Sequence, residues 1–137
     1  MYKKMKIKGY KSDKIFSGYI TIAPKPFGKV ILAYTDTDEH IEYEDVHIHT
    51  SFNRIRELLL NKGKKLLCKG CRIDVHPSGR QLTTIFAYKL TLGKRVSSST
   101  DEIMIFDEEL DLTKIGSVTQ QKEFYKKWLK SIEDLPY

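Results

Sequence analysis

The first 49 residues form short runs in which apolar and polar side chains alternate, and this pattern constrains the fold more than any other feature. Residues 4–10, KMKIKGY, place Met5 and Ile7 between lysines, a period of two that is typical of a strand with one buried face. The turn sequence PKPFG occupies residues 24–28. Segments rich in β-branched and aromatic residues lie at 14–23, 29–35 and 40–49. Successive strands joined by short turns favour an antiparallel sheet.

Two helices are predicted after these strands. Ser51 is expected to cap the first, and Gly63 suits the left-handed residue that follows a helix end. The apolar stripe of this helix has helical spacing and consists of Phe52, Ile55, Leu58 and Leu59. Thr119 is expected to cap the second helix. Its broad apolar face contains Phe124, Tyr125, Trp128, Leu129 and Ile132.

Further strands are predicted at 64–76, 83–92 and 102–106, and PSGRQL joins the first two of these. The sequence therefore predicts a single α+β domain over residues 1–137. We expect a mainly antiparallel sheet of about six to eight strands with two covering helices. A compact β barrel with appended helices is the alternative.

The targeting features of the chain are few. No apolar run approaches the roughly 20 residues that span a bilayer. The basic N-terminus, MYKKMKIKGY, lacks the apolar stretch of a signal peptide. Cys68 and Cys71 are the two cysteines, which favours reduced thiols over a disulfide scaffold. We expect a complete cytoplasmic protein with no membrane contact.

The net charge of +6 is unevenly distributed. Residues 1–30 contain eight lysines and one acid, whereas residues 36–45 and 101–111 each contain six acids and no lysine or arginine. These acidic segments are either solvated loops or a local negative field that a basic partner recognises. The candidate partner-binding residues are Asp36, Asp38, Glu39, Glu42, Glu44, Asp101, Glu102, Asp107 and Glu108.

The segment DVHPSG at residues 74–79 ends a predicted strand, and either a turn or a functional site would explain it. Pro77 lacks an N–H and stops the ladder, Ser78 can hold the turn, and Gly79 can adopt a positive φ. The candidate turn motif consists of Arg72, Asp74, Pro77, Ser78 and Gly79, with Asp74 bonded to turn amides or paired with Arg72 or Arg80. Alternatively, Arg72, Asp74, His76 and Arg80 form a polar surface for a partner. PSG is not the G-x-S-x-G nucleophile elbow, so we assign no catalytic residue.

Residues 66–81, LLCKGCRIDVHPSGRQ, resemble a pattern found in bacterial immunity proteins of polymorphic and contact-dependent growth inhibition toxin systems. The matching residues are Arg72, Asp74, Val75, Pro77, Ser78 and Gly79, with Tyr88 downstream, and His76 replaces the usual aromatic residue. The resemblance covers about 30 residues. It implies a non-enzymatic protein that binds its cognate toxin domain and blocks the toxin's active site or its access to another factor.

Three other functions remain open at this stage. Cys68 and Cys71 would form a zinc site together with His47 and His49 if both histidines lay on one strand face. The same two histidines would suit metal-independent RNA cleavage. Lysines that alternate with aromatic residues in the first 30 positions are compatible with nucleic-acid binding.

The sequence favours a binding protein over an enzyme, with no cofactor or metal. Its expected partner is a toxin domain, most simply a nuclease whose positive groove meets an acidic face of this chain. Nucleic-acid binding is the second choice.

Overall fold

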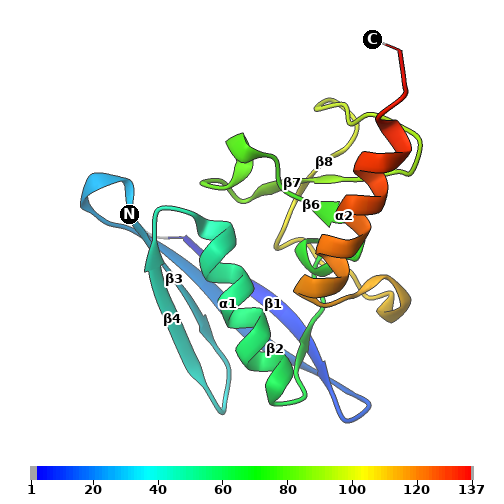
Figure 1. The fold of residues 1–137 in the computed structure, drawn as a ribbon. Helices are drawn as coiled ribbons and strands as arrows, with labels where there is room; N and C mark the ends of the chain where they lie inside the picture. Colours follow the sequence, from blue (N-terminus) through cyan, green and yellow to red (C-terminus); the bar gives the residue numbers. More distant parts are fainter. Residues whose placement is uncertain (1–2, 137) are drawn as a thin grey trace.

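The computed structural model describes residues 3–136, which contain eight strands and two α-helices (Figure 1). In chain order these are β1 (Lys3–Lys11), β2 (Lys14–Pro24), β3 (Val30–Thr35), β4 (His40–Asp45), α1 (Ile48–Asn61), β5 (Lys65–Leu66), β6 (Val75–His76), β7 (Phe86–Lys89), β8 (Glu102–Met104) and α2 (Val118–Ile132). Short 3-10 helices lie at Pro26–Gly28, Lys69–Cys71, Gly79–Gln81 and Leu112–Lys114.

The strands form two antiparallel sheets. Five strands are ordered β4-β3-β2-β1-β5, and three are ordered β6-β7-β8. This arrangement confirms the predicted α+β class, with mainly antiparallel strands and two helices. Over the described residues each sheet keeps two edge strands, so the alternative of a closed barrel is wrong.

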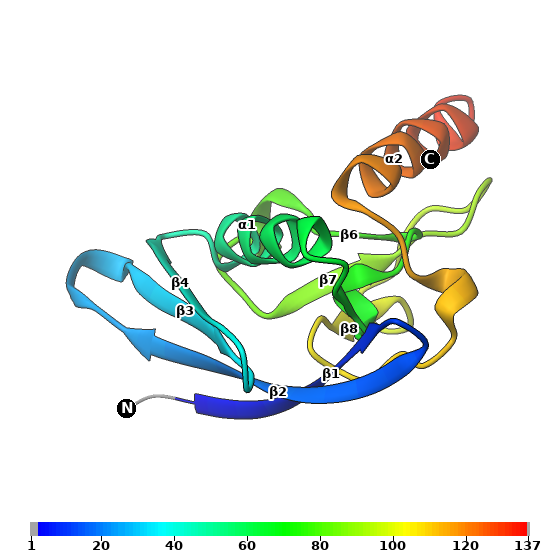
Figure 2. The same ribbon diagram turned by 90° about the horizontal axis from the view of Figure 1, so that it is seen from below.

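Helix α1 lies against one face of the five-stranded sheet, and Figure 2 shows no helix or strand of the described residues on the opposite face. Ile7, Ile20 and Leu32 of the sheet pack with Phe52 and Ile55 of α1 in one hydrophobic cluster. The same cluster includes residues of the three-stranded sheet. The alternation of the first strands therefore has the predicted cause: one side of each strand is buried under a helix.

The predicted strand at 40–49 is wrong in its last four residues. β4 ends at Asp45, and the Asp45 carboxylate accepts a hydrogen bond of 2.8 Å from the His47 N–H. This bond supports a turn, after which α1 begins at Ile48. His47 and the residues that follow it therefore belong to a helix start instead of a strand.

The start and face of α1 also differ from the prediction, whereas its end agrees with it. Ser51 is buried inside the helix and does not cap it, because the buried Ile48 extends the apolar stripe by one turn before Phe52. Leu58 is 39% exposed, so it lies at the margin of the stripe. Gly63 adopts φ +77°, which confirms the left-handed residue after the helix.

The predicted strand at 64–76 is wrong as a continuous element, because a 3-10 turn separates β5 from β6. Gly70 explains this interruption. Its N–H donates to the Ile105 carbonyl (2.8 Å), and a Cβ at position 70 would lie 2.7 Å from the Ile105 Cβ. Glycine allows this close approach of two backbones. Strands shorter than predicted form within 83–92 and 102–106.

Helix α2 packs against β6 and begins two residues earlier than its predicted cap implies. Ser117, not Thr119, is the cap: the Ser117 hydroxyl accepts from the Gln120 N–H (3.1 Å), and the Gln120 side chain accepts from the Ser117 N–H (2.8 Å). Trp128 is buried and donates through its Nε1–H to a loop carbonyl (2.8 Å). Leu129, predicted on the apolar face, is 43% exposed.

Candidate protein-binding surface

The face of the five-stranded sheet opposite α1 is the candidate site. Because side chains alternate along a strand, the residues between the buried positions point away from α1. We define the outer face by these side chains: Lys4, Lys6 and Lys8 of β1; Ile15, Ser17, Tyr19, Thr21 and Ala23 of β2; Ile31, Ala33 and Thr35 of β3; His40, Glu42 and Glu44 of β4. No helix or second sheet within residues 3–136 covers this face (Figure 2).

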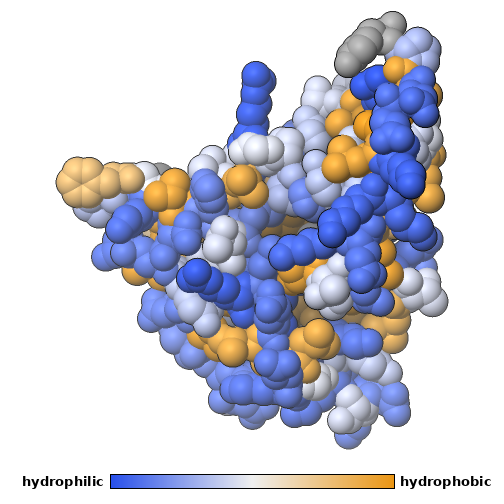
Figure 3. Space-filling model, viewed as in Figure 1, coloured by the Kyte–Doolittle hydropathy of each residue, from blue (hydrophilic) through white to orange (hydrophobic). Residues whose placement is uncertain are grey.

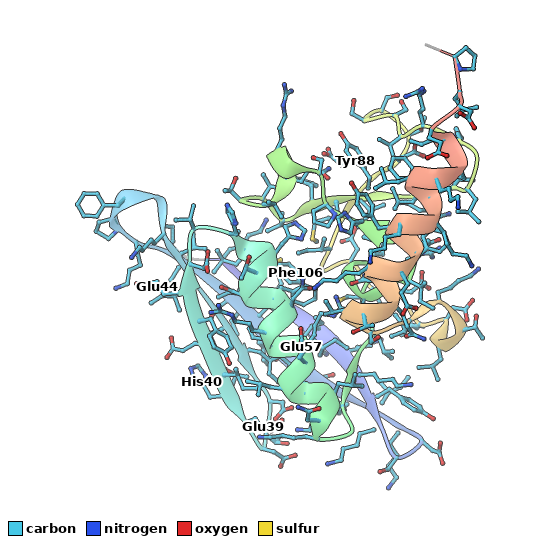
Figure 4. All side chains as sticks on the ribbon, viewed as in Figure 1. Glu39, His40, Glu44, Glu57, Tyr88 and Phe106 are labelled. Atoms are coloured by element: carbon cyan, nitrogen blue, oxygen red, sulfur yellow. The ribbon has the colours of Figure 1, made fainter. Side chains whose placement is uncertain are left out.

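The outer face has opposite charges on its two sides. Lysines lie on β1, and Glu42 and Glu44 lie on β4. The strand register aligns Lys4 across Thr21 and Ala33 with Glu42. Figure 4 shows His40 and Glu44 at separate positions along β4. A partner with one basic and one acidic region would complement this division.

Apolar and aromatic side chains are spread along the outer face. Tyr19 is 42% exposed, Ile15 is 58% exposed near the β1–β2 turn, and Ile31 is half-buried near the β2–β3 turn. The Lys4 Nζ lies 4.4 Å from the centroid of the Tyr19 ring, a cation–π contact that occupies one side of the ring. Exposed aromatic and apolar side chains among polar ones are found in many protein–protein interfaces.

The first acidic segment is largely used inside the protein. The Lys64 Nζ lies 2.8 Å from the Asp36 Oδ2, 2.9 Å from the Glu39 Oε2 and 3.4 Å from the Asp38 Oδ2. The side chains of Asp36 and Glu39 are only 2% and 8% exposed. Burial acts to raise the pKa of Asp36, but hydrogen bonds from Lys64 and Tyr34 outweigh it and lower that pKa. Asp36 and Glu39 therefore fasten the β3–β4 turn to the end of α1, and Figure 4 shows Glu39 there.

The second acidic segment does not join the first. Glu108 forms a β-bridge just after β5, at the edge of the sheet opposite β4, and its side chain pairs with Lys8 (2.8 Å). Asp101 and Glu102 accept hydrogen bonds from within the chain, whereas Asp107 is exposed. The structure therefore does not bring the nine candidate acids into one patch: Glu42 and Glu44 lie on β4, whereas Glu108 lies beside Lys8 at the opposite edge of the sheet.

Arg72 pairs with acids from two separate segments of the chain, Asp74 and Glu109. The Arg72 Nε and Nη2 donate to the two Asp74 oxygens (2.8 and 2.9 Å), which confirms the predicted pairing. Arg72 also donates through Nη1 to Glu109. Because these groups satisfy one another and are 15–21% exposed, they stabilise the turn instead of presenting free charges.

The rest of the motif forms a 3-10 turn. Pro77 follows β6, and the Ser78 N–H donates to the Gln81 side chain (2.9 Å). Gly79 does not have a positive φ, so that part of the turn prediction is wrong. The candidate turn motif thus mainly stabilises the local backbone.

The predicted His47 and His49 pair does not assemble. Both residues lie at the start of α1, and the His49 Nε2 is 2.8 Å from the Phe86 carbonyl. The Cys68 and Cys71 sulfurs are buried 3.4 Å apart, and burial raises the pKa of Cys68. Among residues 3–136, no group of three or more His, Cys, Asp or Glu side chains would hold a metal ion. The one-face arrangement needed for zinc binding and RNA cleavage is therefore wrong.

Two cavities lie between α1 and the start of α2. Figure 3 shows hydrophobic surface between these helices. The larger, of about 440 Å³, is lined by residues that include Arg56 and Leu60. The smaller, of about 140 Å³, contains His49 and His76. The His76 ring stacks on Tyr125 with centroids 3.8 Å apart. His49 thus connects α1 to β7, and the His76 ring connects β6 to α2.

These two histidines predict an acid-sensitive fold. Burial lowers the pKa of His49 and of His76, so between the folded and unfolded values the unfolded chain binds more protons. The free energy of unfolding should therefore decrease as pH falls below about 6.5, and should level off below the folded-state pKa values. Urea unfolding between about pH 7.5 and 5 measures this, and His76→Phe should reduce the slope. A wild-type stability that is constant or higher at the acidic end would contradict the prediction.

No protein-family model matches the chain, and a search of the curated proteins finds no relative either. No helix in the described part of the chain has the length and apolar character needed to cross a membrane.

Proposed function

We propose that this chain is a cytoplasmic immunity protein that binds a cognate bacterial toxin domain and neutralises it by occlusion. The observation that carries the proposal is the outer face, which no described helix or second sheet covers, with its exposed apolar side chains and separated charges. The resemblance of residues 66–81 to immunity proteins supports the class. In this proposal the protein makes and breaks no covalent bonds.

The proposed mechanism combines steering with burial. A nuclease groove is basic because it binds phosphates, so Glu42 and Glu44 would speed its encounter with this chain. Burial of Tyr19 and Ile15 would then slow dissociation. Asp36 and Glu39 are not among the proposed contact residues, because both are buried and paired with Lys64.

Nucleic-acid binding is the second candidate, and the lysines of β1 favour it. A bound phosphate backbone would run from these lysines toward Glu42 and Glu44, which repel it. Lys4 also covers one side of the Tyr19 ring, which restricts base stacking. Protein binding therefore accounts for the whole face better than nucleic-acid binding does.

Co-expression with the protein encoded immediately upstream tests the proposed function. We expect a stable complex on purification, and recovery of growth in cells that the C-terminal domain of that protein arrests. The purified chain should leave RNA intact. Failure to form a complex, failure to restore growth, or RNA degradation that is lost in His49→Ala would each contradict the proposal.

Charge reversal on β4 is predicted to slow association. The double substitution Glu42→Lys and Glu44→Lys should reduce the association rate constant about tenfold at low salt and weaken its dependence on ionic strength. Glu57→Lys with Glu123→Lys is the matched control, because it reverses two exposed acids that lie on α1 and α2 instead of the outer face. Stopped-flow association with the upstream-encoded domain measures both. Equal slowing by the two double variants would count against the β4 side of the outer face.

A further inference from the structure

The tip of the β2–β3 hairpin presents an unusual aromatic residue. Phe27 is 98% exposed, although phenylalanine is normally among the more buried residues. It also has φ +65° and ψ +31°, a left-handed conformation that bulky side chains rarely adopt. Figure 3 shows hydrophobic surface that stands clear of the body at this end of the molecule.

The tip is built to hold this conformation. Pro24 and Pro26 fix two backbone φ angles, and the Lys25 N–H donates to the Lys29 carbonyl (2.8 Å), which closes the loop. A Cβ added at Gly28 would meet nothing within 4 Å, so the tip is open to solvent. A strained bulky residue in a closed, exposed loop is a feature found at ligand-binding positions.

The charges near Phe27 differ from those farther along the outer face. Residues 24–29, PKPFGK, contain Lys25 and Lys29 and no acid. The base of the hairpin pairs Ala23 with Ile31, and Ile31 with Glu44. A basic aromatic tip therefore adjoins the acidic side of the outer face, so one partner can contact both.

We propose that the β2–β3 tip is the anchor that enters the active-site cleft of the toxin, with Phe27 in an apolar subsite and Lys25 and Lys29 beside acidic groups. This inference rests on the proposed immunity function. Metal-dependent nucleases place carboxylates inside a groove that is otherwise basic. The two lysines complement such carboxylates, and Glu42 and Glu44 complement the surrounding groove. The partner surface is thus a protein cleft with an acidic interior and a basic margin.

A lipid surface explains the tip less well. One acyl chain gives only marginal membrane binding, and stable anchoring requires a second signal. A single phenyl ring buries less apolar surface than an acyl chain. Lys25 and Lys29 attract anionic headgroups, but two lysines are fewer than the roughly four to eight of lipid-binding clusters, and Glu44 near the base of the hairpin opposes them. A central aromatic anchor in a protein pocket, by contrast, is a common source of binding energy.

Phe27→Gly separates binding from folding. Glycine adopts a positive φ without strain, so the variant should melt at the same temperature as the wild type or higher. Its affinity for the upstream-encoded toxin domain should fall about 30-fold or more. Leu92→Ala, which shortens an apolar loop residue that is 50% exposed in the other half of the protein, should leave affinity unchanged. The wild type should also compete with an oligonucleotide substrate for the toxin.

The outcomes distinguish this inference from the proposed function. If Phe27→Gly binds as tightly as the wild type while the β4 charge reversals weaken binding, the anchor is overturned and the immunity function stands. If the wild type forms no complex with the toxin domain, both are overturned. Cosedimentation with phosphatidylcholine–phosphatidylserine vesicles that Phe27→Gly abolishes would overturn the anchor by assigning the tip to a membrane.

Discussion

Lys64→Met is expected to lower the free energy of unfolding by about 3–5 kcal/mol, the cost of leaving buried charges without a partner. The Lys64 side chain is 5% exposed and contacts two carboxylates that are also buried, Asp36 and Glu39. Methionine preserves most of the side-chain volume but removes the ammonium group. Asp36 would then keep the hydrogen bond from Tyr34 while losing its ion pair.

Lys62→Met is the matched control for this loss. Lys62 pairs with Glu39, which is part of the same acidic cluster, but its own side chain is 55% exposed. Exposed ion pairs contribute about 0–1 kcal/mol, so this variant should unfold near the wild-type urea concentration. Equal effects of the two substitutions would show that burial does not determine the strength of this cluster.

Arg56→Leu is the second substitution with a large expected effect, and it should lower the free energy of unfolding by about 2–6 kcal/mol. Arg56 is 7% exposed, and its guanidinium donates to the Gln121 Oε1 (2.7 Å) and to the Gly116 carbonyl (2.9 Å). The Gln121 amide in turn donates to the carbonyls of Gly70 (2.9 Å) and Arg72 (2.6 Å). Loss of Arg56 leaves two acceptors unsatisfied near the core, and each costs about 1–3 kcal/mol.

This loss should be concentrated where α2 joins the rest of the protein. The fluorescence of Trp128, which is buried on α2, should report unfolding of Arg56→Leu at a lower urea concentration than circular dichroism does. Arg54→Leu is the control on the same helix, since Arg54 is exposed and lies over the Tyr43 ring at 5.6 Å. If Arg56→Leu proves as stable as Arg54→Leu, the role of Arg56 in joining the two helices is contradicted.

The first half of the fold was predictable because its strands are long and one side of each is buried. Met5, Ile7 and Gly9 alternate with lysines over nine residues of β1, so the period is visible. The second half was harder, since β5 and β6 have two residues each. Its backbone is set by distant contacts such as Ile73 N–H to the Lys114 carbonyl (2.8 Å), which no local pattern encodes.

The candidate site was predictable only in part, for related reasons. Charge clustering identified Glu42 and Glu44, but it could not distinguish them from Asp36, whose partner Lys64 lies 28 residues later in the sequence. Phe27 was assigned to a turn without a role. The available signal was an aromatic residue between proline and glycine in a short loop, where no strand or helix can bury it.

Lysine acetylation of the complex tests the central claim, that the outer face contacts the toxin, most directly. Lys4 and Lys6 lie on the outer face, whereas Lys126 and Lys127 are exposed on α2. Mass spectrometry should show strong protection of Lys4 and Lys6 when the upstream-encoded domain is bound, with Lys126 and Lys127 modified as in the free protein. Protection confined to the lysines of α2 would contradict the account.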